Sequence, residues 1–213
     1  MSDLRQQLDK VFTFFKPENL AAQTIKYEGE VALLVIDVQK EYCDPQGSRG
    51  TAETAEISKR IQSLAPEFRK AGIPVYAVYF SRKEKKDASE IDFYEFTPQP
   101  DDVLVAKNRN SAFEGSNIKE LLEKDKKKLL LICGFNLNAC VRSTVLDARK
   151  AGFEVCLLRD LTGNDNNNSS RWAEDHLADM RDKGVTIEQS EKVLELVHAK
   201  KNASTGLSNQ LTA

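Results

Sequence analysis

Residues 31–37 read Val-Ala-Leu-Leu-Val-Ile-Asp, an apolar run that ends on a carboxylate. A short run that is apolar at every position, rather than at alternate positions, predicts a strand that is buried on both faces. Strands of this kind occur in parallel sheets that helices cover on both sides. The stretch therefore indicates an α/β domain and places Asp37 at the carboxyl end of a buried strand.

Further strand-like runs follow, separated by segments with helical spacing. They cover residues 73–80, 102–106, 129–133 and 153–158, with a shorter run at 185–187. Apolar residues recur at helical spacing over 57–68, 117–126, 140–151, 171–183 and 190–199. Because strands that alternate with helices form βαβ units, we expect a three-layer αβα domain over residues 31–199. Its sheet should be mostly parallel and doubly wound, with about five to six strands.

The two ends of the chain differ from this domain. Residues 1–30 carry one amphipathic helical face, made of Leu4, Leu8, Val11, Phe12 and Phe15. This face predicts a helical extension that docks on the domain or on a sister subunit, and a partner-binding arm is the alternative. Residues 200–213 are polar and small, without periodicity, which is typical of a disordered tail.

Composition limits the classes of function. The 33 acidic and 31 basic residues give a net charge of −2, so no overall positive field favours nucleic acid or an anionic membrane. The N-terminus lacks the apolar segment of a secretory signal, and no apolar run is long enough to span a bilayer. The 4 cysteines show no CxxC pairing, so we expect free thiols in a reducing, cytoplasmic compartment.

Reactive side chains follow three of the expected strands. Asp37 comes directly after the first strand, Lys107 after the third, and Cys140 one tight turn beyond the fourth, at the start of a helix. Any one of them alone could simply mark where the chain meets water. Together they lie where ligands bind in a parallel sheet, at the carboxyl ends of the strands.

This arrangement predicts a cysteine nucleophile. The helix start and Lys107 would favour the Cys140 thiolate, and Asp37 would accept the thiol proton and return it to a leaving amine. Backbone N–H groups in the turn before the helix would stabilise an oxyanion. The usual base, histidine, is represented only by His176 and His198, for which we expect surface or packing roles.

Three motifs resemble the isochorismatase-like cysteine hydrolases, a superfamily that includes nicotinamidases, N-carbamoylsarcosine amidases and ureidoacrylate amidohydrolases. They are Leu-Leu-Val-Ile-Asp-Val-Gln at 33–39, Asp-Asp-Val-Leu-Val-Ala-Lys at 101–107 leading to Ser-Ala-Phe at 111–113, and Cys-Gly-Phe-Asn-Leu-Asn-Ala-Cys-Val-Arg at 133–142. The resemblance covers about residues 29–198. It implies a catalytic triad of Asp37, Lys107 and Cys140.

The resemblance also implies details of the site. It places a non-proline cis peptide bond at Phe135–Asn136 and an oxyanion hole in the backbone N–H groups of Asn136 and Cys140. Nicotinamidases hold a metal through an Asp and two His after the second strand, but the matching segment here, residues 81–87, contains no His. We therefore expect no metal and no other cofactor. Family members commonly form homo-oligomers, so we expect a dimer or larger.

The wall of a substrate pocket has four candidates, which are Gln39, Tyr42, Phe113 and Asn138. Tyr42 and Phe113 could equally be core aromatics. The Asn-rich segment 164–168 is either a simple turn or the edge of a pocket or subunit interface.

These observations predict a hydrolase that cleaves a non-peptide C–N bond. The substrate would be a small amide, carbamoyl or ureido compound, and the reaction would pass through a thioester on Cys140. Vinyl ether hydrolysis of the isochorismatase type is one alternative, because it uses the Asp and Lys and needs no cysteine. A non-catalytic binding module on the same fold is the other.

Overall fold

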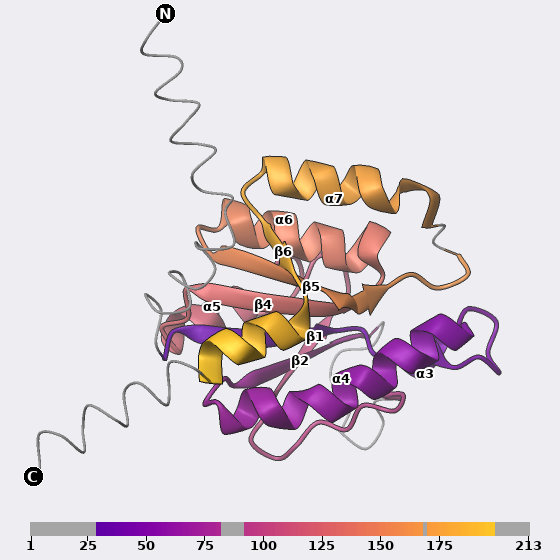
Figure 1. Ribbon diagram of the computed structural model, residues 1–213, viewed down its shortest axis with the longest axis horizontal. Helices are drawn as coiled ribbons and strands as arrows, with labels where there is room; N and C mark the ends of the chain where they lie inside the picture. The colour runs from indigo at the N-terminus through magenta and orange to yellow at the C-terminus, as the bar shows by residue number, and fades with distance from the viewer. Residues whose placement is uncertain (1–28, 82–91, 168–169, 199–213) are drawn as a thin grey trace, which may run out of the picture.

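The structure is a computed structural model that describes residues 29–81, 92–167 and 170–198. These residues form a parallel sheet between two layers of helices (Figure 1). The strands are β1 (Val31–Ile36), β2 (Val75–Phe80), β3 (Val103–Lys107), β4 (Leu129–Phe135), β5 (Glu154–Gly163) and β6 (Thr186–Glu188). Every neighbouring pair of these strands runs parallel, so the predicted three-layer α/β architecture is confirmed.

The order of the strands fixes where a site can form. Within the described residues the order is β3-β2-β1-β4-β5-β6, so the sheet grows outward from β1 on one side and from β4 on the other. In open α/β sheets, ligands bind at the carboxyl edge where the winding direction reverses. Asp37 directly follows β1 and Cys140 follows β4, so the two residues flank this switch point.

Helices cover both faces of the sheet. On one face lie α4 (Ala52–Lys70) and a last helix over residues 190–198. On the other face lie α5 (Ile118–Lys124), α6 (Arg142–Lys150) and α7 (Ala173–Asp182) (Figure 1). The all-apolar pattern of β1 follows from this, because Leu33 and Val35 belong to the first core while Leu34 and Ile36 belong to the second.

Gly134 allows β4 to end close against β1. It is the register partner of Ile36 and has a φ of 112°, which L residues rarely adopt. A Cβ at this position would lie 2.0 Å from the Ile36 carbonyl oxygen. Glycine is therefore required where the chain leaves β4 for the turn that carries Cys140.

Two elements differ from the sequence expectation. The expected helix over 140–151 is divided into a π-helical turn over Leu137–Val141 and then α6. β5 extends to Gly163 rather than ending at 158, because after a register shift Thr162 and Gly163 pair with Gly134 and Phe135. This extension carries residues 164 and 165 to the carboxyl edge of the sheet, beside the turn.

The predicted helical extension, except for residues 29 and 30, and the predicted tail over 200–213 lie outside the described residues. Among the described residues, no helix has the length and apolar character needed to cross a bilayer.

Candidate active site

Asp37 and Lys107 form an ion pair at the carboxyl edge of the sheet. The distance from Lys107 Nζ to Asp37 Oδ2 is 2.7 Å, and the side chains expose 0% and 1% of their surface. Lys107 Nζ also donates to the Arg109 carbonyl at 3.1 Å and lies 5.0 Å from the centre of the Phe80 ring. Asp37 itself has a φ of 51°, in the left-handed region, at the point where the chain turns out of β1.

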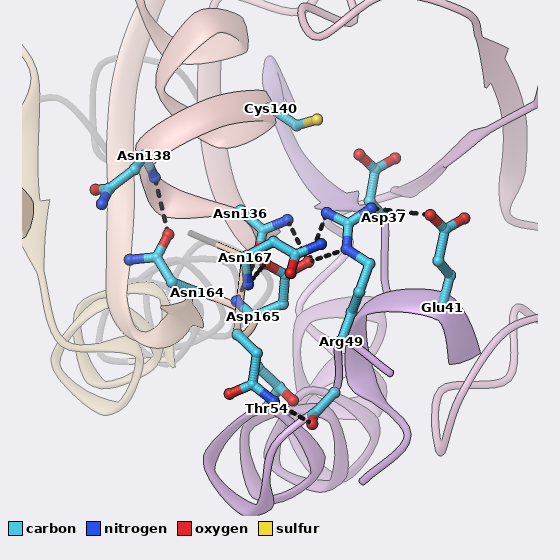
Figure 2. A network of polar contacts seen from close by, with 12 residues as sticks. Asp37, Glu41, Arg49, Thr54, Asn136, Asn138, Cys140, Asn164, Asp165 and Asn167 are labelled. Atoms are coloured by element: carbon cyan, nitrogen blue, oxygen red, sulfur yellow. Dashed lines mark hydrogen bonds and ion pairs between the residues drawn. The ribbon is translucent and has the colours of Figure 1, made fainter. Parts of the chain in front are cut away.

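Cys140 lies next to this pair. Figure 2 shows its sulfur turned toward the side of the site where the Asp37 carboxylate lies. The charges of both Asp37 and Lys107 act on the thiol, so the three side chains form one group although they follow three different strands. The exposed residue Asn110 lies on the rim, with its Oδ1 4.0 Å from Cys140 Sγ.

Burial dominates the electrostatics of the group. It raises the pKa of the Asp37 carboxyl above the usual 3.8, although Lys107 pulls in the opposite direction. Burial, and after it the negative charge of Asp37, raise the pKa of the Cys140 thiol to about 12, against the effect of Lys107. Lys107 therefore favours the thiolate, as expected, but burial and the charge of Asp37 outweigh its effect. The Lys107 charge is already paired with Asp37, so the thiol keeps its proton until a base removes it.

The turn before Cys140 has the predicted cis peptide bond at Phe135–Asn136. Asn136 is extended, with φ −97° and ψ 141°, and caps the π-helical turn. Its carbonyl accepts the N–H groups of Ala139 and Val141, each at 3.0 Å. The backbones of Asn136 and Cys140 thus belong to one compact turn, and their role as oxyanion donors stays a prediction.

Of the pocket candidates, Gln39 and Tyr42 lie near the ion pair. Gln39 uses both ends of its carboxamide on the Phe80 backbone, since Nε2 donates to the carbonyl at 3.2 Å and Oε1 accepts the N–H at 2.7 Å. Gln39 therefore holds the end of β2, where the Phe80 ring lies beside the Lys107 ammonium group. Tyr42 is buried, and its burial together with the charge of Asp37 raises the pKa of its hydroxyl.

Phe113 and Asn138 are placed differently from Gln39 and Tyr42. The Phe113 ring packs on Phe153, with 5.7 Å between the ring centres, and Phe153 directly precedes β5 at the amino edge of the sheet. Phe113 therefore packs on the second core, and its role in a pocket wall stays a prediction. The Asn138 side chain turns away from Cys140 (Figure 2), and its Oδ1 lies 3.0 Å from His176 Nδ1.

Sequence reasoning left the role of residues 164–168 open, and the structure places two of them at the turn. Asn164 Oδ1 accepts the N–H of Asn138 at 3.0 Å. The Asp165 N–H donates to Asn136 Oδ1 at 2.7 Å (Figure 2). The Asn-rich composition indicated only a turn, because the extension of β5 that brings the segment here depends on pairing with β4. Asn110 was also missed, and its only signal was its position between Lys107 and Ser111.

A cavity of about 550 Å³ lies at another part of the surface, lined by residues from Phe93 to Leu104. None of the three triad residues lines it. We therefore do not assign this cavity to the reaction.

The fold and the site define a class of α/β proteins that carry a carboxylate, a cation and a cysteine at the carboxyl edge of a parallel sheet. The sequence model of the Isochorismatase domain matches residues 31–192. The chain therefore belongs to the isochorismatase family and is a hydrolase of that family.

Known relatives agree with this membership. The chain is 29% identical over 140 residues to the secreted isochorismatase effector Isc1 of Verticillium dahliae, covering 62% of this chain and 71% of that one. It is 23% identical over 198 residues to an N-carbamoylsarcosine amidase of Arthrobacter sp, covering 82% and 74%. It is 27% identical over 173 residues to the ureidoacrylate amidohydrolase RutB of Pseudomonas syringae, covering 63% and 71%.

Solved structures share the fold. The pyrazinamidase of Pyrococcus horikoshii in complex with zinc superposes with a TM-score of 0.66 at 26% identity, over 75% of this chain and 99% of that one. A cysteine hydrolase from Pseudomonas syringae pv. phaseolicola gives a TM-score of 0.71 at 21% identity, over 80% and 93%.

Among the described residues, no group of three or more His, Cys, Asp or Glu side chains is placed to hold a metal ion. Residues 82–87, most of the segment that was compared with the metal-binding segment of nicotinamidases, lie outside the described residues, so the expectation of no metal stays a prediction.

Proposed function

We propose that the chain is an amidohydrolase of small amide, carbamoyl or ureido compounds that acts through a thioester on Cys140. One observation carries the proposal: the buried Asp37–Lys107 pair lies beside a cysteine whose pKa is raised. A thiol in this state needs a base at the moment of attack. Asp37 is suited to that role, because burial raises its pKa and so makes it a stronger proton acceptor.

In the first half of the reaction, Cys140 Sγ attacks the substrate carbonyl carbon while the Asp37 carboxylate takes the thiol proton. A C–S bond forms and the carbonyl electrons move to oxygen, where the backbone N–H groups of Asn136 and Cys140 hold the oxyanion. The C–N bond then breaks and Asp37 gives its proton to the nitrogen. The amine leaves, and the acyl group stays on Cys140 as a thioester.

In the second half, water replaces the amine. Asp37 takes a proton from water, and the resulting hydroxide attacks the thioester carbonyl. The C–S bond breaks, the acid leaves, and Asp37 returns the proton to the sulfur. Lys107 keeps the carboxylate in place and balances its charge through both halves, which is consistent with its complete burial against Asp37.

The relatives support the choice of substrate class. Those reported above include enzymes named N-carbamoylsarcosine amidase, ureidoacrylate amidohydrolase and pyrazinamidase. All three names describe hydrolysis of a C–N bond in a small molecule. The first probes should therefore be N-carbamoylsarcosine, ureidoacrylate and pyrazinamide, followed by a wider panel of small carboxamides.

The test measures release of ammonia or amine by the wild type and by Cys140→Ala and Asp37→Asn. We expect each variant to stay folded and to lose at least about 10³-fold in kcat on any compound that the wild type cleaves. Full activity in folded Cys140→Ala would refute the mechanism. Release of pyruvate from isochorismate, unaffected by that substitution, would instead identify a vinyl ether hydrolase.

We further propose a cytoplasmic location and a homo-oligomer. The location is supported by the four cysteines, all of which are free and buried. Size-exclusion chromatography with light scattering tests the assembly, and a monomer at micromolar concentration would contradict it.

A further inference from the structure

A polar network extends from the turn at Asn136 to the other side of the switch point (Figure 2). It begins at Arg49, in the connection between α3 (Lys40–Cys43) and α4. The guanidinium reaches Asp165 Oδ2 through Nε at 2.7 Å and through its second terminal nitrogen at 2.6 Å. The Asp165 side chain is fully buried. Arg49 also bonds Glu41 at 2.9 Å and lies 4.5 Å from the centre of the Tyr42 ring.

Asp165 in turn holds the side chain of Asn136 at two points. The Asp165 N–H donates to Asn136 Oδ1 at 2.7 Å, and Asn136 Nδ2 donates to Asp165 Oδ2 at 3.3 Å. The other carboxylate oxygen accepts the N–H of Asn167 at 3.1 Å. Asn136 is itself 2% exposed. A carboxamide bonded at both ends has one orientation, which restrains the backbone of the residue that carries it.

We propose that Arg49 and Asp165 are positioning residues that hold the oxyanion turn of residues 136–140 through the Asn136 side chain. The inference rests on the proposed function, which gives the Asn136 N–H its role as a donor. Donors to an oxyanion act only when they are fixed close to the productive geometry. A buried carboxylate is costly unless it is paired and hydrogen-bonded, and Asp165 is paired with Arg49 and bonded to Asn136.

The network also joins the two halves of the site. Arg49 contacts Glu41 and Tyr42, which belong to the short helix after β1, the strand that carries Asp37. Asp165 and Asn136 belong to the segments after β5 and β4. The Arg49–Asp165 pair therefore links the segment that follows Asp37 to the turn that carries Asn136 and Cys140.

The chain offers a matched control in Arg69 and Asp102. This pair is also two-pronged, with contacts of 2.9 Å and 2.5 Å, and its side chains are 22% and 2% exposed, against 23% and 0% for Arg49 and Asp165. Asp102 directly precedes β3, at the amino edge of the sheet and so at the opposite edge from Cys140. The double variants are Arg49→Gln/Asp165→Asn and Arg69→Gln/Asp102→Asn. Each removes both members of one buried ion pair, so neither member is left behind as an unpaired buried charge.

Two measurements on the full chain test the proposal. The first is kcat and KM on a compound that the wild type cleaves. The second is amide hydrogen exchange of residues 136–141, which needs no substrate. For Arg49→Gln/Asp165→Asn we expect kcat to fall about 10- to 100-fold while KM stays within about threefold, because the oxyanion exists only in the transition state. Exchange in the turn should rise at least about tenfold, and the control variant should match the wild type in both measurements.

The proposal is overturned if the Arg49/Asp165 variant matches its control in kcat and in turn exchange. It is also overturned if the loss appears in KM with kcat retained, because that would make Arg49 a substrate-binding residue. If the wild type cleaves no compound of the panel, the proposed function fails and hydrogen exchange alone decides the positioning role. A rise confined to residues 136–141 then supports it, and unchanged exchange overturns it.

Discussion

Replacing Asp37 by Asn should make Cys140 more reactive toward an alkylating agent and at the same time abolish hydrolysis. The pKa of the Cys140 thiol is raised to about 12 by burial and then by the Asp37 charge, while Lys107 acts in the opposite direction. A charge at about 4–6 Å moves a pKa by about 1–3 units, so Asp37→Asn should lower the pKa of the Cys140 thiol by about that amount. Lys107, released from its partner, would act in the same direction.

The expected change in rate follows from this lower pKa. At pH 8 the thiolate fraction would rise about 10- to 1,000-fold. A less basic thiolate is a weaker nucleophile, and a Brønsted slope near 0.5 cancels about half of the gain on a logarithmic scale. The rate of Cys140 alkylation should therefore rise about 3- to 30-fold. Hydrolysis should be lost because no base remains to activate water or to protonate the amine.

The assay is alkylation by iodoacetamide at pH 8, followed by peptide mass spectrometry of the Cys140 peptide. Glu41→Gln is the control, because it removes a carboxylate that lies near Asp37 but acts less on the Cys140 thiol than Asp37 does. Cys133, which is fully buried, should stay unlabelled in each folded variant. An unchanged or slower rate in folded Asp37→Asn would refute the view that Asp37 holds the thiol in its protonated form.

Three other changes have definite expected outcomes. Lys107→Met should lower the free energy of unfolding by about 3–5 kcal/mol at pH 7, because it leaves Asp37 buried and unpaired. Since the pKa of the folded Asp37 then rises further, this loss should shrink as pH falls toward 3.8, and an equal loss at pH 4 and pH 7 in urea titrations would contradict it. The hydrolysis rate should fall on the acid side through a pKa above 3.8, as Asp37 takes up a proton, and a flat profile down to acid unfolding would exclude Asp37 as the base. Gly134→Ala should destabilise the fold more than Gly152→Ala, because both glycines have positive φ (112° and 91°) but only Gly134 lacks space for a Cβ, and equal denaturation midpoints would contradict this.

The sequence allowed prediction of the strands and of the triad because both depend on local patterns. The all-apolar run at 31–36 needs cover on both faces, and the structure provides two cores around it. Asp37, Lys107 and Cys140 converge because parallel strands align their carboxyl ends at one edge. The three residues are far apart along the chain, but their convergence could still be predicted because each lies at the end of its own strand or one turn beyond it.

The parts that could not be predicted depend on contacts between distant segments. Arg159 and Asp160 interrupt the apolar pattern of β5 and resemble its end. Asp160 is nevertheless accommodated, because it bonds Arg60 and the Ser190 N–H and hydroxyl. The π-helical turn depends on the bond from the Val141 N–H to the Asn136 carbonyl, which helical spacing does not reveal.

The raised pKa of Cys140 and the contacts of Gln39 also depend on which side chains become neighbours in the fold. The sequence placed a cation near the thiol, but only the structure shows that Asp37 already pairs with it in a buried setting. Gln39 was expected to line a pocket, yet its carboxamide is used on Phe80. Polar residues near a site are thus identified by position, while their roles depend on which partner each one finds.

The measurement that tests the central claim most directly is the capture of an acyl group on Cys140. The wild type is mixed with a substrate found in the amide panel and quenched in acid within a single turnover. Peptide mass spectrometry should then show the acyl mass on the peptide that contains Cys140, removable by hydroxylamine and missing from Cys140→Ala. An unmodified Cys140 during turnover, together with undiminished product release by folded Cys140→Ala, would contradict the account.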